Sequence, residues 1–200
     1  MSDSKSMAIA TIRAEHRALA AVINNMKGVL AEVKAGRMRL DFPLFWSMIY
    51  YIDAFPDRLH HPKEDDWLFR RLRQRTHEAD ALIDELQRQH RNEPLALNDL
   101  RRWLGNLEAG VAGSLDHLGQ AVTDYAEFTW KHLKSEEQDL LPLAELHLTQ
   151  TDWNEIAHAF GQNGDPLVGV DDDAALGALF HDIVRRTPAP LGLGSQQLKE

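Results

Sequence analysis

The segment His60-His61-Pro62-Lys63-Glu64 places a histidine four residues before a glutamate, and His132-Leu133-Lys134-Ser135-Glu136 repeats this spacing. On an α-helix, residues four positions apart lie on the same face, so each segment can direct an imidazole nitrogen and a carboxylate oxygen toward one point. An acidic residue and an apolar run follow the glutamate in both cases, over residues 65–69 and 137–143. One such pair is common by chance, but two in similar surroundings suggest a metal site.

The composition limits what this site can contain. The chain has 200 residues, a formal net charge of -9 and no cysteine. The absence of cysteine excludes disulfides, thiolate metal sites and cysteine-held iron–sulfur clusters. A metal must therefore be held by imidazole and carboxylate groups, which suits iron, manganese or zinc. The negative charge argues against nucleic acid and anionic membranes as partners. No apolar run has the length of a membrane span and residues 1–7 lack a secretory signal, so we expect a cytoplasmic protein.

The hydrophobic pattern predicts four long helices. The first covers about residues 8–34, where apolar positions recur every three or four residues and Gly36 ends the helix. The second begins after Asp41, a candidate N-cap, and is either kinked or split by Pro56 and Pro62. The core-facing residues predicted for the first helix are Ile9, Ile12, His16, Leu19, Ile23, Met26 and Leu30.

The third helix is expected to start near residue 76 or 78 and to kink at Pro94. The fourth is expected to run from Ser114, a possible cap, to about His147. Four amphipathic helices with short connections predict an all-α fold, an antiparallel up-down-up-down four-helix bundle over residues 1–148. Residues 149–200 are expected to form a helical extension packed on the bundle, with short helices over 151–160 and 171–186, a turn over 161–166 and a loose tail from residue 187.

Each predicted helix carries one histidine on its core-facing stripe, and two glutamates join them. A single buried histidine needs only one hydrogen-bonding partner, but a glutamate in a core is costly unless it is paired or bound to metal. A purely structural role therefore explains the whole set poorly. Two of the six groups are carboxylates that can bridge, so the set suits a site for two metal ions inside a bundle, with iron preferred over manganese or zinc. The six residues are His16, His60, Glu64, His90, His132 and Glu136.

This arrangement resembles hemerythrin-like proteins, which contain an HHE cation-binding domain. The resemblance covers about residues 8–186 and includes the local sequences over 60–69 and 82–90, with a suggestive tail over 152–167. It implies an antiparallel four-helix bundle that holds two iron ions bridged by carboxylates. By the resemblance, the six residues named above are the ligands.

Two positions depart from the pattern of the oxygen-carrying hemerythrins. Those proteins have a second histidine four residues after the one on the third helix, where this chain has Pro94. Their fourth-helix motif ends in an aspartate five residues after the histidine, where this chain has Glu137. Oxygen transport is therefore in doubt, and sensing or redox roles are favoured.

Several neighbouring residues are ambiguous. His61 is either a further ligand, as the corresponding residue is in some family members, or a residue that faces solvent or caps a helix beginning at Pro62. Glu136 is preferred over Glu137 as ligand, and Glu137 and Asp139 are interpreted as a solvated face. The other histidines lack partners at ligand spacing. Residues 155 and 158 form one Glu-x-x-His motif, whereas ferritin-like sites need two.

The leading hypothesis for function is a protein that binds or senses a small molecule such as O2, NO or peroxide at a non-haem di-iron centre. Three alternatives remain open. The same centre could act as a redox enzyme on peroxide or nitric oxide, it could serve iron storage or iron sensing, or the histidines could be structural in a metal-free interaction module. The sequence does not indicate the oligomeric state.

Overall fold

The structure is a computed structural model that describes residues 3–162 and 171–194. All regular secondary structure within these residues is helical, as the sequence predicts. Three short π-helical segments interrupt the α-helices. The elements are α1 (Ser4–Lys34), α2 (Phe42–Phe55), η1 (Pro56–His60), α3 (His61–Lys63), η2 (Glu64–Phe69), α4 (Arg70–Arg75), α5 (Asp80–Glu108), α6 (Ser114–Ser135), η3 (Glu136–Leu140), α7 (Leu141–His147), α8 (Gln150–Gln162) and α9 (Asp171–Arg186).

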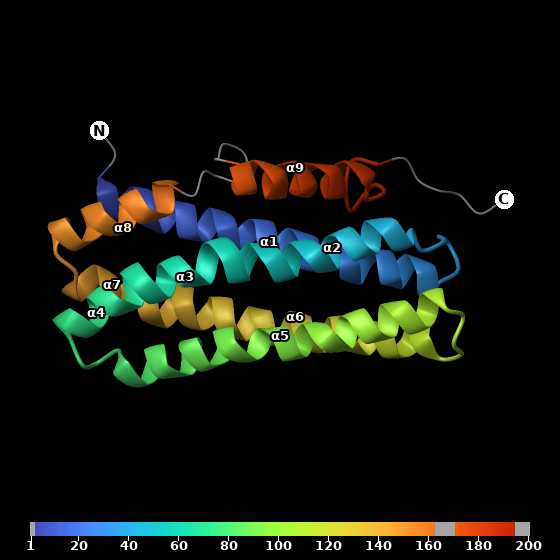
Figure 1. Cartoon of the computed structure of the whole chain (residues 1–200), viewed down its shortest axis with the longest axis horizontal. Helices are drawn as coiled ribbons and strands as arrows, with labels where there is room; N and C mark the ends of the chain where they lie inside the picture. The colour runs from blue at the N-terminus through green and yellow to red at the C-terminus, as the bar shows by residue number, and fades with distance from the viewer. Residues whose placement is uncertain (1–2, 163–170, 195–200) are drawn as a thin grey trace.

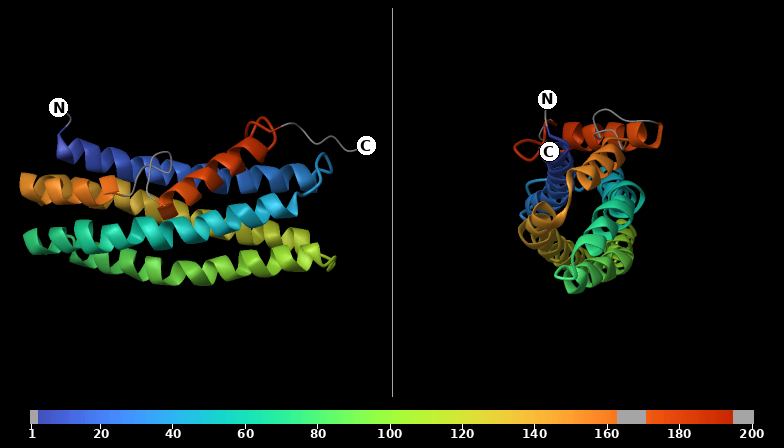
Figure 2. Two further views of the ribbon diagram at one scale, coloured as in Figure 1. Left: turned by 45° about the horizontal axis from the view of Figure 1, so that its top comes forward. Right: turned by 90° about the vertical axis from the view of Figure 1, so that its left-hand side faces the viewer.

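The long helices lie side by side along the length of the molecule (Figures 1 and 2). α1 contacts α2 and α6, and α5 contacts the same two helices. The four helices therefore surround a shared interior. Every residue of the stripe predicted for the first helix is buried, so the hydrophobic pattern correctly identified its inner face.

The second helical stretch is neither broken nor ended by its prolines. α2, η1, α3, η2 and α4 follow one another without an intervening loop, and the residues at each joint keep right-handed helical dihedral angles. Around Pro56 the chain winds into a π turn, in which the backbone N–H of His61 donates to the carbonyl of Pro56. The wider turn tolerates the missing proline N–H, so the helix continues to Arg75. α5 likewise runs as one helix with Pro94 inside it.

The turns between helices depend on glycine at three positions. Gly36, Gly110 and Gly113 have φ angles of 71°, 76° and 78°, a left-handed conformation that other residues adopt at a cost. The Asp41 carboxylate accepts a hydrogen bond from the N–H of Leu44 at 3.0 Å, so the predicted N-cap is confirmed. The cap predicted at Ser114 is wrong, because Gly113 occupies the N-cap position of α6.

The hydrophobic core consists of two clusters separated along the helices by polar residues. On α1 one cluster reaches Ile12 and the other begins at Leu19, and on α5 they are separated between Leu86 and Leu97. The predicted histidines and glutamates occupy the intervals between the clusters. The core thus encloses a polar layer and shields it from solvent at both ends.

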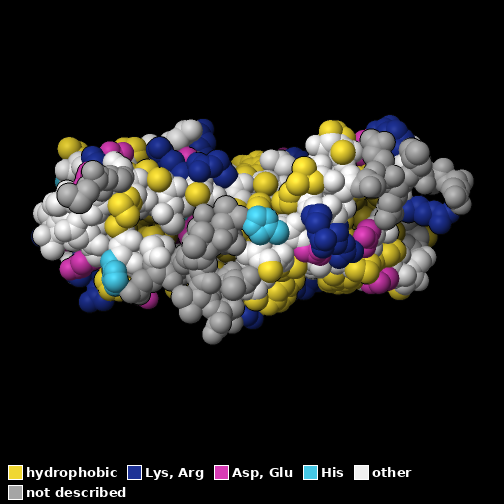
Figure 3. Space-filling view, turned by 90° about the horizontal axis from the view of Figure 1, so that it is seen from above, with side chains coloured by type: hydrophobic (Ala, Val, Ile, Leu, Met, Phe, Trp, Pro, Cys, Tyr) yellow, Lys and Arg dark blue, Asp and Glu magenta, His cyan; other side chains and the backbone are white. Residues whose placement is uncertain are grey.

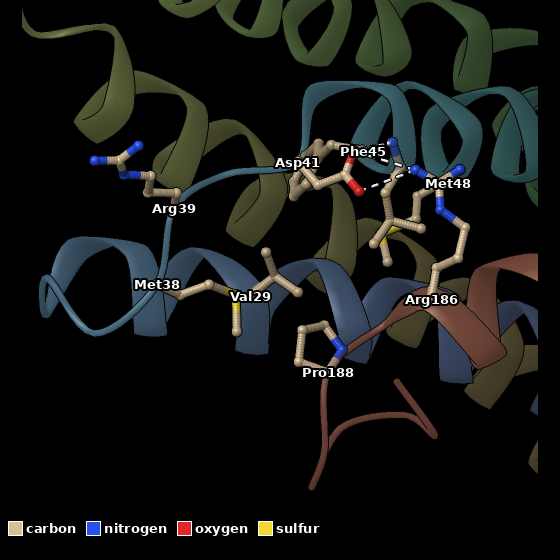
Figure 4. A pocket seen from close by; sticks show the side chains of 9 residues that line it. Val29, Met38, Arg39, Asp41, Phe45, Met48, Arg186 and Pro188 are labelled. Atoms are coloured by element: carbon tan, nitrogen blue, oxygen red, sulfur yellow. Dashed lines mark hydrogen bonds and ion pairs between the residues drawn. The ribbon is translucent and has the colours of Figure 1, made fainter. Parts of the chain in front are cut away.

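The C-terminal part covers one side of the long helices. α8 lies against α1, and α9 lies across α1 and α2 (Figures 1 and 2). Arg186 of α9 binds the Asp41 carboxylate through Nη2, at 2.9 Å from Oδ2 (Figure 4). The tail was predicted to be loose. Its described part, residues 187–194, instead folds back toward α1, where Leu191 packs against Gly28. Residues 195–200 and most of the predicted turn over 161–166 lie outside the described residues.

The charged side chains on the face that carries α9 are mixed in sign. Figure 3 shows side chains of both charges scattered among hydrophobic ones over the face that carries α9. No helix in residues 3–162 or 171–194 is both long enough and apolar enough to cross a membrane.

Candidate metal centre

The structure brings all seven predicted site residues together in two groups of possible metal donors. The ligand atoms of each group lie within 4.8 Å of one another. Glu64 belongs to both groups, so it lies where a carboxylate could bridge two cations. The first group is His16, His60, Glu64 and Glu136, and the second is His61, Glu64, His90 and His132.

Each glutamate directs its two oxygens toward different histidines. Oε1 of Glu64 is 3.4 Å from Nε2 of His60, and Oε2 is 3.6 Å from Nε2 of His90. Oε2 of Glu136 is 3.2 Å from Nε2 of His16, and Oε1 is 3.2 Å from Nε2 of His132. Both carboxylates therefore span the two groups, which is the placement that the bridging hypothesis requires.

The π-helical segments explain why adjacent residues both reach the site. His60 is the last residue of η1, while Glu64 and Glu136 begin η2 and η3. A π turn has an i→i+5 hydrogen bond and more residues per turn than an α-helix, and such turns are common at functional sites. The extra residue lets His60 and His61 face the interior together, although neighbours on a regular α-helix point about 100° apart.

A second layer of side chains orients the histidines. In four of the five imidazoles, Nε2 faces the interior and Nδ1 contacts a carboxylate or amide oxygen. Such partners fix the tautomer and orientation of a metal-binding histidine and raise its basicity. The pairs and their distances are His60 with Glu15 (2.7 Å), His16 with Glu137 (2.9 Å), His132 with Gln89 (2.9 Å) and His90 with Asp65 (3.4 Å).

The inner atoms of the two groups are left without hydrogen bonds. Both carboxylate oxygens of Glu64 and of Glu136, and Nε2 of His90 and of His132, are buried and find no hydrogen-bond partner among the described residues. Leaving a buried polar atom unsatisfied costs roughly 1–3 kcal/mol. A pair of divalent cations would satisfy all of these atoms and neutralise both carboxylates, so the residues present fit a two-metal centre.

The sequence model of the hemerythrin HHE cation-binding domain matches residues 7–144 of the chain. The chain belongs to this family. The match includes every residue of both donor groups and ends before α8. Comparisons with curated proteins and with solved structures give no match.

The electrostatics of this HHE domain show how the metal-free groups balance their charges. Burial lowers the pKa of His16, but the carboxylates of Glu136 and Glu137, which lie beside its two ring nitrogens, outweigh burial and raise the pKa to about 9. Burial opposes protonation of His90 as well, and Asp65 with Glu136 raises its pKa to about 9. Protons thus occupy positions that cations can take, and metal binding would release them.

The two glutamates have opposite shifts. Burial, followed by the charge of Glu136, raises the pKa of Glu64 well above its usual range. Burial also disfavours the charged form of Glu136, but the surrounding histidines, led by His132, hold its pKa well below the usual range. Glu136 is therefore charged among the histidines of the metal-free chain, while Glu64 tends to hold a proton.

A small pocket opens beside the second donor group. The pocket has room for about one water molecule. Its walls combine imidazoles with apolar side chains from α1 and α6. The lining residues are Leu19, His60, His61, Gln89, His90, Glu93, Phe128, Thr129, His132 and Leu133.

The structure settles the orientation of the ambiguous residues. His61 is only 9 % exposed and lies in the second donor group, so the interpretation as a solvent-facing residue is wrong. Glu136 lies inside at 1 % exposure, as preferred. The interpretation of Glu137 as a solvated face was incomplete: its side chain is 35 % exposed, but Oε1 contacts Nδ1 of His16.

Sequence reasoning missed the roles of Glu15, Gln89 and Glu93. Each is buried, and two of them directly precede a donor-group histidine. A polar residue next to a core-facing histidine was the available signal. It is weak, because on a regular helix the neighbour of a core-facing residue points elsewhere.

The remaining histidines do not join either group. His77 is exposed and pairs with Asp80 at 2.9 Å, and His117 stacks on Trp103 with ring centroids 4.2 Å apart. Tyr51 and Tyr125 are buried near the layer of donors, whereas Tyr50 is 48 % exposed.

Proposed function

We propose that this chain is a di-iron protein of the HHE family that binds or senses a small molecule such as O2, NO or peroxide. The observation that carries the proposal is the pair of donor groups that share Glu64. Ligation by imidazole and carboxylate without thiolate favours iron, with manganese and zinc as less favoured occupants. The helix contacts support an antiparallel up-down bundle as the scaffold, as in the proposed family fold.

The pocket supports a role for a small ligand. It lies against three imidazoles of the second group, His61, His90 and His132. Seven protein ligands do not fill twelve positions around two six-coordinate ions, so a coordination position remains for an exogenous molecule. Bound iron would supply such open positions together with one-electron redox chemistry.

Elemental analysis and a visible spectrum of the protein from iron-supplemented cells test the proposal. We expect two metal ions per chain, mostly iron, and absorbance in the near-ultraviolet. Protein without metal after this treatment would refute the proposal and leave only a structural role for the histidines.

Reversible oxygen carriage is not the expected activity. Pro94 stands where oxygen carriers have a second histidine on the third helix, and the fifth imidazole of this site, His61, comes from the second helical stretch instead. We therefore expect the reduced protein to oxidise in air and the oxidised protein to react with peroxide or nitric oxide. Stopped-flow spectra after mixing the reduced protein with oxygen decide this. Oxygen that is held for minutes and regained under vacuum would restore the carrier hypothesis.

The second candidate function is a redox enzyme acting on peroxide or nitric oxide at the same centre. The pocket favours it as much as binding, because substrate could reach the second donor group there. Repeated turnover of added peroxide by the iron-loaded protein, lost in Glu64→Ala, would favour the enzyme. A single stoichiometric reaction would favour binding or sensing.

A further inference from the structure

Glu93 is a buried carboxylate that belongs to neither donor group. It lies on α5, one turn after His90, and is 7 % exposed. It also lines the pocket beside the second group. Because a buried glutamate is costly unless its oxygens have partners, its contacts indicate its role.

The two oxygens of Glu93 face different residues. Oε1 accepts a hydrogen bond from the Tyr125 hydroxyl at 2.6 Å, and Oε2 lies 3.6 Å from Nδ1 of His61. The Tyr125 hydroxyl is also 3.4 Å from the carbonyl oxygen of Ile52. A phenol has one proton to donate, so the much shorter contact to Glu93 takes it. Tyr125 therefore holds one oxygen of Glu93 and leaves the other directed at His61.

His61 differs from the other histidines of the site. Each of the others has Nδ1 within 3.4 Å of an orienting oxygen, whereas the His61 ring makes no hydrogen bond among the described residues. The ring is instead stacked on His90, with centroids 3.8 Å apart. Stacking fixes the plane of a ring but does not select which nitrogen carries the proton. Glu93 is placed to make that selection.

We propose that Tyr125 and Glu93 form a positioning pair for His61. Tyr125 fixes the carboxylate, Glu93 accepts the Nδ1 proton of His61, and Nε2 is left to bind the second metal ion. The contact needs to shorten from 3.6 Å to about 2.9 Å to become a hydrogen bond. The inference rests on the metal-binding function proposed above and assigns roles to two residues outside both donor groups.

Cobalt(II) titration of the full-length protein tests the pair. The visible absorption bands of cobalt(II) report the coordination of each bound ion, and competition with a chromophoric chelator gives the two affinities. We call the cobalt ion in the second donor group the second equivalent, and the ion in the first donor group the first equivalent, whichever binds more tightly. In Tyr125→Phe we expect the second equivalent to bind roughly 10- to 100-fold more weakly and with altered bands, because loss of an outer partner typically costs this much. The first equivalent should bind as in the wild type.

Tyr51→Phe is the matched control. Tyr51 is also fully buried, but its hydroxyl has no hydrogen-bond partner among the described residues. The Tyr51→Phe variant should bind both equivalents of cobalt like the wild type. In the double variant His61→Ala/Tyr125→Phe, the second affinity should equal that of His61→Ala alone, because a positioning residue has no effect once its target is gone. A general loosening of the core would instead weaken the double variant further and lower the first affinity.

Glu93→Gln separates positioning from direct ligation. A positioning role predicts that it resembles Tyr125→Phe. If Glu93 were itself a ligand, Glu93→Gln would weaken the second equivalent while Tyr125→Phe left it unchanged, and the proposal would be overturned. The proposal would also be overturned if Tyr125→Phe bound both cobalt ions with the same affinities as the wild type. Wild-type protein that binds no cobalt would refute the proposed function and the pair together.

Discussion

Removal of metal is expected to destabilise the protein strongly. The two donor groups contain six buried atoms without hydrogen bonds among the described residues. At roughly 1–3 kcal/mol for each unsatisfied atom, their gross cost in the metal-free chain is about 6–18 kcal/mol. A domain has a total stability of about 5–15 kcal/mol, so the metal-free layer must relax by admitting water or loosening the helices. Metal should reverse this loosening.

The size of the effect on melting follows from linkage. A cation at one hundred times its dissociation constant stabilises the folded state by about 2.7 kcal/mol, and two such ions by about 5 kcal/mol. For a domain of 150–250 residues, 1 kcal/mol corresponds to about 2–4 °C in Tm. Loading should therefore raise Tm by about 10–20 °C. Circular dichroism melts of chelated and reloaded protein, with metal content verified by elemental analysis, measure the rise.

Two variants make the measurement specific to the site. Glu64→Gln removes the carboxylate shared by both groups and should lose at least half of the metal-dependent rise. Asp139→Asn changes an exposed acid on the same π-helical segment as Glu136 and should retain all of it. Coincident melting curves for wild-type protein with and without metal would refute a metal site in the core.

Four further substitutions have defined outcomes. Glu136→Ala should halve the metal content, whereas Glu137→Ala should weaken binding by roughly 10- to 100-fold and still fill at excess metal; loss of all metal in Glu137→Ala would mean that the donor assignment is wrong. Phe160→Ala should lower the free energy of unfolding by about 3–5 kcal/mol in urea titrations, since this ring is fully buried in α8. An unchanged urea midpoint would show that α8 does not contribute to the core. Arg75, followed by Thr149, holds the pKa of Asp152 below its usual range, so this carboxylate stabilises the fold above about pH 3.9 and its contribution is lost as pH falls; Asp152→Asn should be less stable than wild type at pH 7, and a gap that persists undiminished at pH 2 would contradict this.

The donors could be predicted because their spacing has a simple geometric consequence. His60 and Glu64, like His132 and Glu136, are four residues apart, and a helix puts such residues on one face whatever surrounds them. His16 and His90 followed from apolar stripes with a period near 3.6 residues. These signals survive small changes in helix winding, so the sequence alone predicted which side chains lie together in the two groups.

The second layer could not be predicted for the same geometric reason. Asp65 and Glu137 directly follow inward-facing glutamates, and on a regular α-helix they would point away from the site. The π segments that begin at Glu64 and Glu136 rotate them back toward His90 and His16. A π turn has no reliable sequence signature. Pro56 and Pro62 were predicted to kink or split the second helix, whereas the helix continues through both and winds more widely around Pro56.

The C-terminal extension shows where the family description stops being sufficient. The HHE match ends at residue 144, yet Phe160 of α8 places its ring edge-on to His60, with centroids 6.4 Å apart. Phe180 of α9 contacts Tyr51, which stacks on Phe55 at 5.4 Å. Phe55 in turn faces His60 at 6.3 Å. Aromatic contacts from both C-terminal helices therefore converge on one donor of the first group. Since the surroundings of a metal-binding histidine control its orientation and solvent access, the properties of a metal centre at His60 would depend on residues outside the domain that identifies the family.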